Sequence, residues 1–307
     1  MDFVFTKLLF TLKLNPNNPD PYALYSIRAD FKQVFKSAVC SQNGQCGICP
    51  EQTGCSYHYT FSQALAQDPA ALRRHQKPPL PFVFDLPLLP PQPNSGLELE
   101  IGMTLAGPAI NFIEDYIAAL KLLFSPVNPG HKVSGTITRV ESLGCSDFRS
   151  CIMEEIGDVA LDRVATISAV DLTEMNTLNS NRIVVTLISP LRIVQDGHLL
   201  REFSFSAFVR PLMRRISSLA YYYGNGLEVD FKSLANDSAA VEVVENSFHW
   251  TDWQQESRPD RLSGIIGNGS CSGSLVDYHG LLLLGEQFHV GKGASFGLGR
   301  YRIEREF

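Results

Sequence analysis

The chain has 307 residues, of which 44% are hydrophobic and 19% are charged, and its net charge is −6. That length suits one large domain or two ordinary ones, and the apolar content excludes a largely disordered chain. The acidic total argues against a protein coated in positive charge, although it leaves room for a local basic groove. No run approaches the roughly 18 apolar residues that span a bilayer, and no signal peptide is visible, so we expect a cytoplasmic protein.

The first half of the chain predicts the element order β-α-β-β-α-β. Residues 2–14 have the composition of a strand, and Asp20-Pro21 then opens a helix that ends near Val39. A cysteine-rich loop follows at 40–55. The remaining elements are two extended segments at 81–88 and 97–105, a helix at 108–124 and a strand at 133–140.

The second half repeats this pattern without sequence identity. The expected elements are a strand at 183–193, a helix at 203–223, a strand at 241–253, a glycine-rich strand at 262–273, a short helix at 275–288 and a final strand at 296–304. We therefore expect an α+β chain with two tandem ferredoxin-like (βαββαβ) domains. The first covers residues 1–145 and the second 180–307, with a connector at 146–179.

Residues 289–302 form the most informative segment. Four glycines allow its backbone to take φ > 0 and to bring N–H groups close to a ligand: Gly291, Gly293, Gly297 and Gly299. Dinucleotide and Walker-type loops run from a strand into a helix, whereas these glycines leave a helix and enter a strand. Lys292 lies inside the loop, and Arg300 and Arg302 alternate along the following strand. Glycines beside aligned cations favour a phosphate backbone over a merely flexible turn.

At these residues the sequence resembles a known family. Gly291-Lys292-Gly293, followed by Phe296-Gly297-Leu298-Gly299-Arg300-Tyr301, resembles the C-terminal signature of the CRISPR-associated endoribonucleases of the RAMP superfamily, which process precursor crRNA. Ser189–Ile193 and Phe203–Leu219 resemble the start of that family's second domain and its following helix. The cysteine cluster ending in Cys55-Ser56-Tyr57 resembles an insertion in one branch of the family. The resemblance covers most of the chain and implies two tandem ferredoxin-like domains.

The resemblance also implies a function. Such enzymes bind CRISPR repeat RNA and cut it without a catalytic metal, because the ribose 2′-hydroxyl attacks the adjacent phosphate and leaves a 2′,3′-cyclic phosphate and a 5′-hydroxyl. Partners would be the repeat RNA or crRNA and other subunits of a CRISPR effector complex, with no membrane. The alternative is a non-catalytic crRNA-binding subunit of the same fold. A zinc-dependent DNA-binding regulator would need a helix-turn-helix or a finger, and neither pattern is visible.

Four of the seven cysteines fall within sixteen residues: Cys40, Cys46, Cys49 and Cys55. Four soft thiolates on a glycine-containing loop can close a tetrahedral Zn²⁺ site, which a reducing compartment favours. The spacing is not that of a standard zinc finger, and the alternative is a set of ordinary reduced thiols. We expect a structural zinc that fixes the end of the first helix.

RNA cleavage by a 2′-hydroxyl needs a base, an acid and cations for the developing charge. Many members of the resembling family carry a Tyr on the first helix and a His directly after it. Here Tyr22 and Tyr25 lie on the helix, but no His follows it. Three replacements remain open. His58 can fold back from beyond the cysteine loop, His289 can act beside the glycines, or a site without His can use Tyr25, Lys292 and Arg215.

The helix at 203–223 carries a second group of cations. Arg210 and Arg214 are four residues apart and share a helix face, Arg215 adjoins them, and Arg201 precedes the helix. A solvated face is the ordinary explanation for such charges. In a chain of net charge −6, however, this local excess favours RNA binding. The other histidines have no comparable setting and are expected to be structural or solvated: His75, His131, His198, His249 and His279.

Overall fold

A computed structural model describes residues 3–15, 20–42, 46–69, 71, 77–90, 96–127, 131–175, 180–195, 197–226, 229–253 and 262–306. The chain divides into two compact units. We call Phe5–Leu65 with Leu80–Thr166 the N-terminal unit, and Met1–Val4, Ala66–Pro79 and Ile167–Phe307 the C-terminal unit. Within the described residues, no helix combines the length and apolar character needed to cross a membrane.

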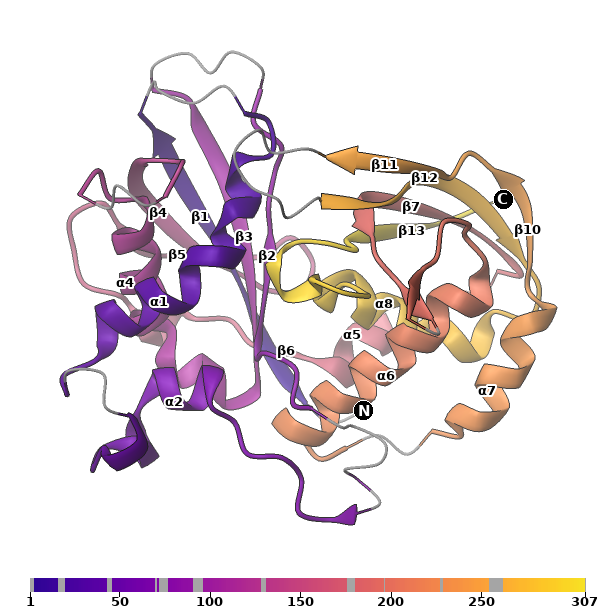
Figure 1. The fold of residues 1–307 in the computed structure, drawn as a ribbon, viewed down its shortest axis with the longest axis horizontal. Helices are drawn as coiled ribbons and strands as arrows, with labels where there is room; N and C mark the ends of the chain where they lie inside the picture. The colour runs from indigo at the N-terminus through magenta and orange to yellow at the C-terminus, as the bar shows by residue number, and fades with distance from the viewer. Residues whose placement is uncertain are drawn as a thin grey trace. The chain divides into compact units, whose positions relative to one another are not determined.

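The N-terminal unit is an antiparallel sheet with the order β2-β3-β1-β4-β5. Its strands are β1 (Val4–Leu14), β2 (Phe82–Asp85), β3 (Glu98–Ala106), β4 (Gly135–Leu143) and β5 (Arg149–Glu154). Its α-helices are α1 (Ile27–Val39), α2 (Ser56–Phe61) and α4 (Ile113–Phe124), and 3-10 turns span Ala23–Ser26, Cys46–Ile48, Gln52–Gly54, Gly107–Phe112 and Leu161–Arg163. Figure 1 shows α1 and α4 on one face of the sheet.

The core of the N-terminal unit is built around aromatic rings that the predicted periodicities bring together. Phe31 of α1 lies with its ring centroid 5.3 Å from that of Phe82 and 5.0 Å from that of Phe84, both in edge-to-face geometry. Tyr116 of α4 packs 4.9 Å from Phe35, and its hydroxyl shares a 2.8 Å hydrogen bond with Thr60. Edge-to-face rings stabilise a core beyond the area that they bury, so α1, α2 and α4 are held together on the sheet.

The C-terminal unit has the sheet order β10-β12-β7-β13, with β11 also paired to β12. The strands of this sheet are β7 (Arg182–Leu191), β10 (Glu242–Asn246), β11 (His249–Trp253), β12 (Leu262–Ser272) and β13 (Tyr301–Arg305). The strands β8 (Val194–Gln195) and β9 (His198–Leu199) pair with each other in a separate two-stranded sheet, and β6 (Ile167–Ser168) pairs with β1. The α-helices of the C-terminal unit are α5 (Ala169–Met175), α6 (Phe205–Tyr223), α7 (Phe231–Asp237) and α8 (His279–Phe288), with 3-10 turns at Ser238–Ala240, Val276–Tyr278 and Ala294–Phe296. Figure 1 shows α6 and α8 on one face of this sheet.

Both sheets place their strands in the order expected of a ferredoxin-like unit. If the four strands of each βαββαβ pattern are numbered along the chain, each sheet reads fourth, first, third, second. The strand β5 adds to the edge of the first sheet, and the second strand of the second sheet is split into β10 and β11. The α+β class with tandem ferredoxin-like folds is therefore confirmed.

Several boundaries differ from those expected from sequence. Residues 146–166, expected as connector, belong to the N-terminal unit, and Ile167 onward belongs to the C-terminal unit, together with 66–79. Strand β13 begins at Tyr301 rather than at 296, because residues 294–299 form tight turns. The helices α5 and α7, seven residues each, are too short to show a clear apolar period.

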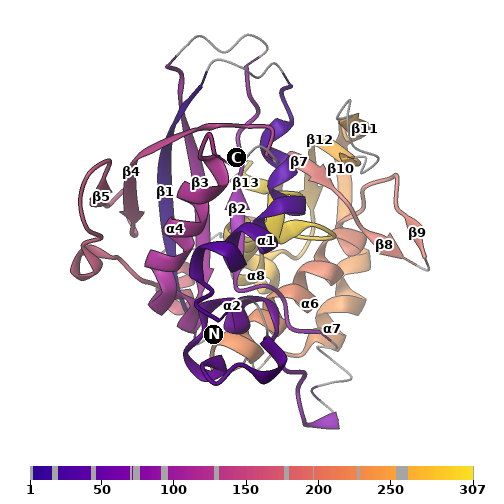
Figure 2. The ribbon, with the colours of Figure 1, turned by 60° about the vertical axis from the view of Figure 1, so that its left-hand side comes forward.

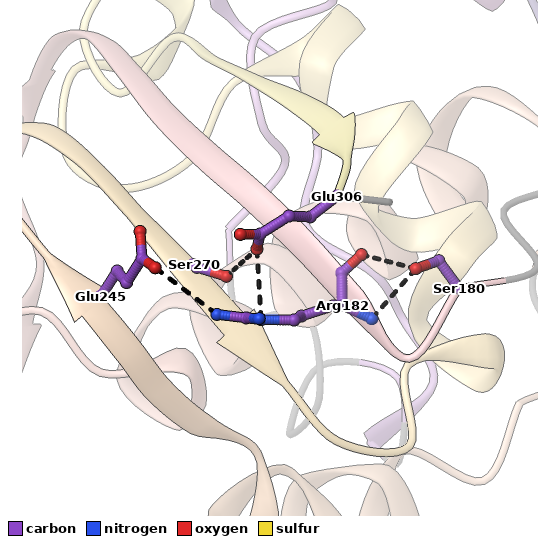
Figure 3. A network of polar contacts seen from close by, with 5 residues as sticks. All are labelled: Ser180, Arg182, Glu245, Ser270 and Glu306. Carbon is purple, nitrogen blue, oxygen red and sulfur yellow. Dashed lines mark hydrogen bonds and ion pairs between the residues drawn. The ribbon is translucent and has the colours of Figure 1, made fainter.

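A polar network ties three strands of the second sheet at one end (Figure 3). Arg182 of β7 lies 3.2 Å from Glu306 and 3.6 Å from Glu245 of β10, and Ser270 of β12 bonds Glu306. Ser180 accepts a 3.1 Å bond from the Arg182 backbone N–H. The Arg182 side chain is 43% exposed, so the ion pairs contribute little stability and chiefly fix the register.

Candidate nucleic-acid interface and active site

The segment 289–300, which we call the glycine loop, links α8 to β13 through a backbone that ordinary residues rarely adopt. Its four glycines have positive φ: 87° at Gly291, 89° at Gly293, 88° at Gly297 and 65° at Gly299. His289 at the start of the loop also has a positive φ, 57°. Left-handed backbone is cheap only for glycine, which explains why glycine recurs at these positions.

The glycine loop is braced against the end of β7. The Lys292 N–H donates to the carbonyl of Arg192 at 2.8 Å, and the Gly299 N–H donates to that of Pro190 at 3.0 Å. The space at these points is already taken. A Cβ at position 291 would lie 2.5 Å from the Arg192 carbonyl oxygen, and one at 299 would overlap the Val290 carbonyl. Two of the glycines are therefore required by packing of the chain itself.

Ser189 fastens the far end of the glycine loop. This buried side chain donates to the Gly297 carbonyl at 2.7 Å and accepts from the Arg300 N–H at 2.9 Å. From the sequence, Ser189 is predicted to have no role beyond its place in the segment Ser189–Ile193 that resembles the family. A lone serine at the end of a strand carries no pattern that would distinguish it, so only the fold reveals this contact.

The predicted RNA-binding cations differ in exposure. Lys292 is exposed at the tip of the glycine loop, and Arg302 is exposed on β13. Arg300 is half-buried and precedes β13, so it does not alternate with Arg302 along one strand as expected. On α6, Arg210 and Arg214 are both exposed, and Arg210 donates to the Ala235 carbonyl at 2.9 Å.

Arg215, a predicted catalytic residue, lies behind the glycine loop. Its Nε donates to the Phe288 carbonyl at 2.7 Å, and Nη2 donates to the Ser295 hydroxyl at 3.3 Å. Burial lowers the pKa of Arg215 to about 10, so the group remains a cation at neutral pH. Within the described residues, no carboxylate lies in ion-pair range of it. Its contacts make it a positioning residue that joins α8 to the loop.

Two of the other catalytic candidates are buried. His289 is 0% exposed, and its backbone N–H donates to the Gly285 carbonyl at 2.7 Å. Tyr25, in the N-terminal unit, is 5% exposed, and its hydroxyl donates to the Leu86 carbonyl at 3.2 Å. Neither side chain is exposed at the surface of this structure. Burial was not expected for either residue, because adjacency to a glycine loop does not report burial, and their catalytic roles stay predictions.

His58, the remaining histidine candidate, is half-buried on α2 in the N-terminal unit. It lines a pocket together with Gln42, Gln52 and Tyr57. The four clustered cysteines line the same pocket: Cys40, Cys46, Cys49 and Cys55. Burial raises the pKa of Tyr57, Lys36 lowers it, and negative charge on Cys46, Cys55 and Cys40 raises it further. The fold thus gathers the predicted zinc ligands around one space.

The sulfur atoms of the same cysteines are not arranged around a common position at metal-coordination distance. In the parts of the chain that the structure describes, no group of three or more His, Cys, Asp or Glu side chains is placed so that it could hold a metal ion. The donor set nevertheless suits zinc, because four thiolates are soft ligands and line one pocket. Binding would require the loop to close further around the ion.

One buried polar cluster was not anticipated. Nδ1 of His131 lies 3.1 Å from the Asp30 carboxylate and 3.4 Å from the Ser26 hydroxyl. The cluster is part of the N-terminal unit, where the His131 ring packs 5.5 Å from Phe124. Both Ser26 and His131 are buried, so the cluster holds the start of α1 rather than serving a substrate. The residues are too far apart in sequence to form a recognisable motif.

Comparisons with known proteins cover nearly the whole chain. One family model, AF_1859_N, described as an N-terminal domain, matches residues 3–163. A second, described as CRISPR-associated endoribonuclease Cas6, matches residues 185–301, which include the glycine loop. An uncharacterized protein from Archaeoglobus fulgidus is 24% identical over 290 residues, which is 92% of this chain and 92% of that protein.

Solved structures share the fold. A Cas6 product complex matches with a TM-score of 0.59 at 14% identity, over 98% of this chain and 100% of that chain. Thermus thermophilus Cas6 matches with a TM-score of 0.56 at 12% identity, over 99% of this chain and 100% of that chain. A chain of a partial Cas6-RT-Cas1–Cas2 complex matches with a TM-score of 0.57 at 12% identity, over 100% of this chain and 47% of that chain.

Proposed function

Because the chain belongs to the Cas6-like family of RAMP proteins and its first half to the AF_1859_N domain family, we propose that it is an endoribonuclease that binds CRISPR repeat RNA and cuts it into crRNA. The single observation that carries this proposal is the glycine loop. Its backbone is fixed on the end of β7 while the Lys292 side chain stays exposed, so a cation is held ready for a phosphate.

The reaction that we propose needs no metal. The 2′-oxygen forms a bond to phosphorus as the bond from phosphorus to the 5′-oxygen breaks. The 2′-hydroxyl gives its proton to a base, and the leaving 5′-oxygen takes one from an acid, which leaves a 2′,3′-cyclic phosphate and a 5′-hydroxyl. Lys292 and Arg302 are exposed cations that would stabilise the charge on the phosphate oxygens. Of the three proposed proton-transfer residues, His58 is the one not enclosed by the fold.

A non-catalytic crRNA-binding subunit is the second candidate. The burial of both His289 and Tyr25 supports it, because two of the proposed proton-transfer groups are enclosed while the cations are exposed. Such a subunit would hold crRNA within a larger CRISPR assembly, and another nuclease would cut. The two candidates predict the same binding and differ only in product formation.

One experiment separates them. Repeat RNA labelled at its 5′ end is incubated with the protein in EDTA, beside a copy with 2′-deoxyribose at the cleavage position. The enzyme cuts the first RNA, leaves a cyclic phosphate and spares the second. Tight binding without product supports the subunit. In the same assay His58→Ala should reduce the single-turnover rate, whereas a wild-type rate would remove His58 from the site.

We also propose a structural zinc in the cysteine pocket. Four thiolates at about 2.3 Å would complete its coordination and fix the loop after α1. Metal analysis of protein purified without chelator should find about one zinc per chain, with Cys46→Ser and Cys49→Ser losing it and Cys145→Ser keeping it. Less than about half an equivalent in the wild type would contradict the site. Thermal melts of the wild type and of the cysteine variants test the zinc site without using RNA.

A further inference from the structure

A cation–aromatic pair on the C-terminal unit joins Arg201, one of the cations beside α6, to Trp250, which has no role assigned so far. The Arg201 guanidinium carbon is 4.9 Å from the centroid of the Trp250 ring. Arg201 is exposed and Trp250 is half-buried. In the described part of the chain, no carboxylate comes within 4.0 Å of Arg201. The ring quadrupole holds the guanidinium in place, and none of the carboxylates that the structure describes forms an ion pair with it.

Two backbone bonds place Arg201 beside the glycine loop. The carbonyl of Arg192 accepts from Lys292, and the carbonyl of the next residue, Ile193, accepts from the Leu200 N–H at 3.0 Å. Lys292 and Leu200 therefore contact the same two-residue stretch at the end of β7. Figure 2 shows the β8–β9 hairpin leaving the sheet at this end of β7, and Arg201 lies two residues after the end of β9.

The strand register brings Trp250 to the same level. Trp250 of β11 pairs with Ile265 of β12, and Ile265 pairs with Leu191, the last residue of β7. Two strand spacings separate Trp250 from Leu191, or about 10 Å across the sheet. Arg201, Trp250 and Lys292 thus gather around one strand end although they are far apart in sequence.

The segment that carries Arg201 is anchored before any ligand arrives. Phe203 stacks on Phe248 with ring centroids 4.0 Å apart, and it also packs 5.5 Å from Phe208 of α6. These contacts join the residues next to Arg201 with the turn that precedes β11. A surface held in this way loses little conformational entropy when it binds.

We propose that Arg201 and Trp250 form a subsite for an unpaired nucleobase of the RNA whose phosphate lies at Lys292, an inference that rests on the proposed function. A base offers a flat π face that stacks on a guanidinium plane or on an indole without demanding a particular sequence. Arg201, which pairs with no described carboxylate, adds a second exposed cation to that of Lys292. A peptide would gain stacking from few of its residues, so the pair favours RNA.

The test uses repeat RNA with 2-aminopurine at successive unpaired positions on either side of the cleavage site. Stacking on Trp250 should quench the fluorescence at one position when the protein binds. Trp250→Leu should abolish that quenching and weaken binding about tenfold. Trp250→Phe keeps a ring and should keep most of both. Arg201→Gln should weaken binding in low salt, whereas Arg163→Gln, an exposed arginine of the N-terminal unit, should not.

The outcomes distinguish failure of the proposed base subsite from failure of the proposed function. If Lys292→Ala weakens binding but Trp250→Leu binds and quenches as the wild type does, the subsite is wrong and RNA binding stands. If the wild type does not bind repeat RNA at all, both proposals fail. Circular-dichroism melts of each variant show whether a loss of binding comes from unfolding, and Trp250→Phe carries the test if Trp250→Leu does not fold.

Discussion

The Arg215 guanidinium of α6 donates from Nε to the Phe288 carbonyl at 2.7 Å, at the residue where α8 ends. The last carbonyls of a helix lack partners within it, and a cation there also meets the negative end of the helix dipole. Its second bond, to Ser295, lies inside the glycine loop. One side chain thus satisfies the helix end and holds the loop that follows.

Arg215→Met should therefore disturb the glycine loop without removing a charge from the surface. A buried hydrogen bond to a charged donor contributes about 1.5–3 kcal/mol, so we expect the free energy of unfolding to fall by about that amount. RNA affinity should fall at every salt concentration while the slope of log K against log salt stays unchanged. Urea denaturation and filter binding measure the two effects. A changed slope would show that Arg215 contacts phosphate after all.

Lys292→Ala should give the opposite signature. Its side chain is exposed, so stability should hardly change, but one phosphate contact is lost. The salt slope should decrease by about 0.7–0.9, the value for one neutralised phosphate. Lys121→Ala on α4, also exposed, is the matched control and should leave the slope intact. Equal slopes for Lys292→Ala and the wild type would show that Lys292 contacts no phosphate of the RNA.

Gly299→Ala tests the packing explanation of the glycines. The position has φ of 65°, and a Cβ there overlaps the Val290 carbonyl, so strain and overpacking should together cost about 2–5 kcal/mol. Gly54→Ala has open space around its Cβ and should change stability by less than about 0.5 kcal/mol. Thermal and urea unfolding compare the two. A fully stable Gly299→Ala would leave RNA contact as the only reason for glycine at this position.

Cysteine reactivity should separate the thiols by burial. Cys271 on β12 is 0% exposed, and burial raises its pKa to about 12. At pH 8 its thiol stays protonated in the folded protein and should resist maleimide until urea unfolds the chain. The unfolded thiol ionises from its ordinary pKa upward, so this group should also lower stability as pH rises from about 9 toward 12. Mass spectrometry of native and unfolded labelling reactions reads this out.

The sequence predicted the fold well because the strongly periodic elements govern it. Phe31 and Phe35 are four residues apart on one helix face, and both lie in the core as that spacing requires. The elements that the sequence did not predict depend on contacts between residues that are distant in the chain. Strand β5 reads as a polar connector because only residues 152 and 153 are buried in it, and it forms by adding to β4.

Only those features of the candidate site that depend on local sequence could be predicted. The exposure of Lys292 and the positive φ of the glycines follow from local chemistry that a sequence displays. The enclosure of His289 does not, because it depends on how α8, the glycine loop and β7 pack together. Ser189 and the Arg201–Trp250 pair likewise arise only when strands distant in the chain are paired.

The place of β13 in the second sheet has a consequence for synthesis. Strand β7 pairs with β13 along one edge, yet the chain from Leu191 to Tyr301 must be made before that pairing can form. At translation rates of about 5–20 residues per second, this edge of β7 waits roughly 5–20 seconds without its partner. An open strand edge is a template for pairing with another chain. Ribosome stalling within this interval should therefore produce nascent chains that aggregate, and the glycine loop is among the last features to form.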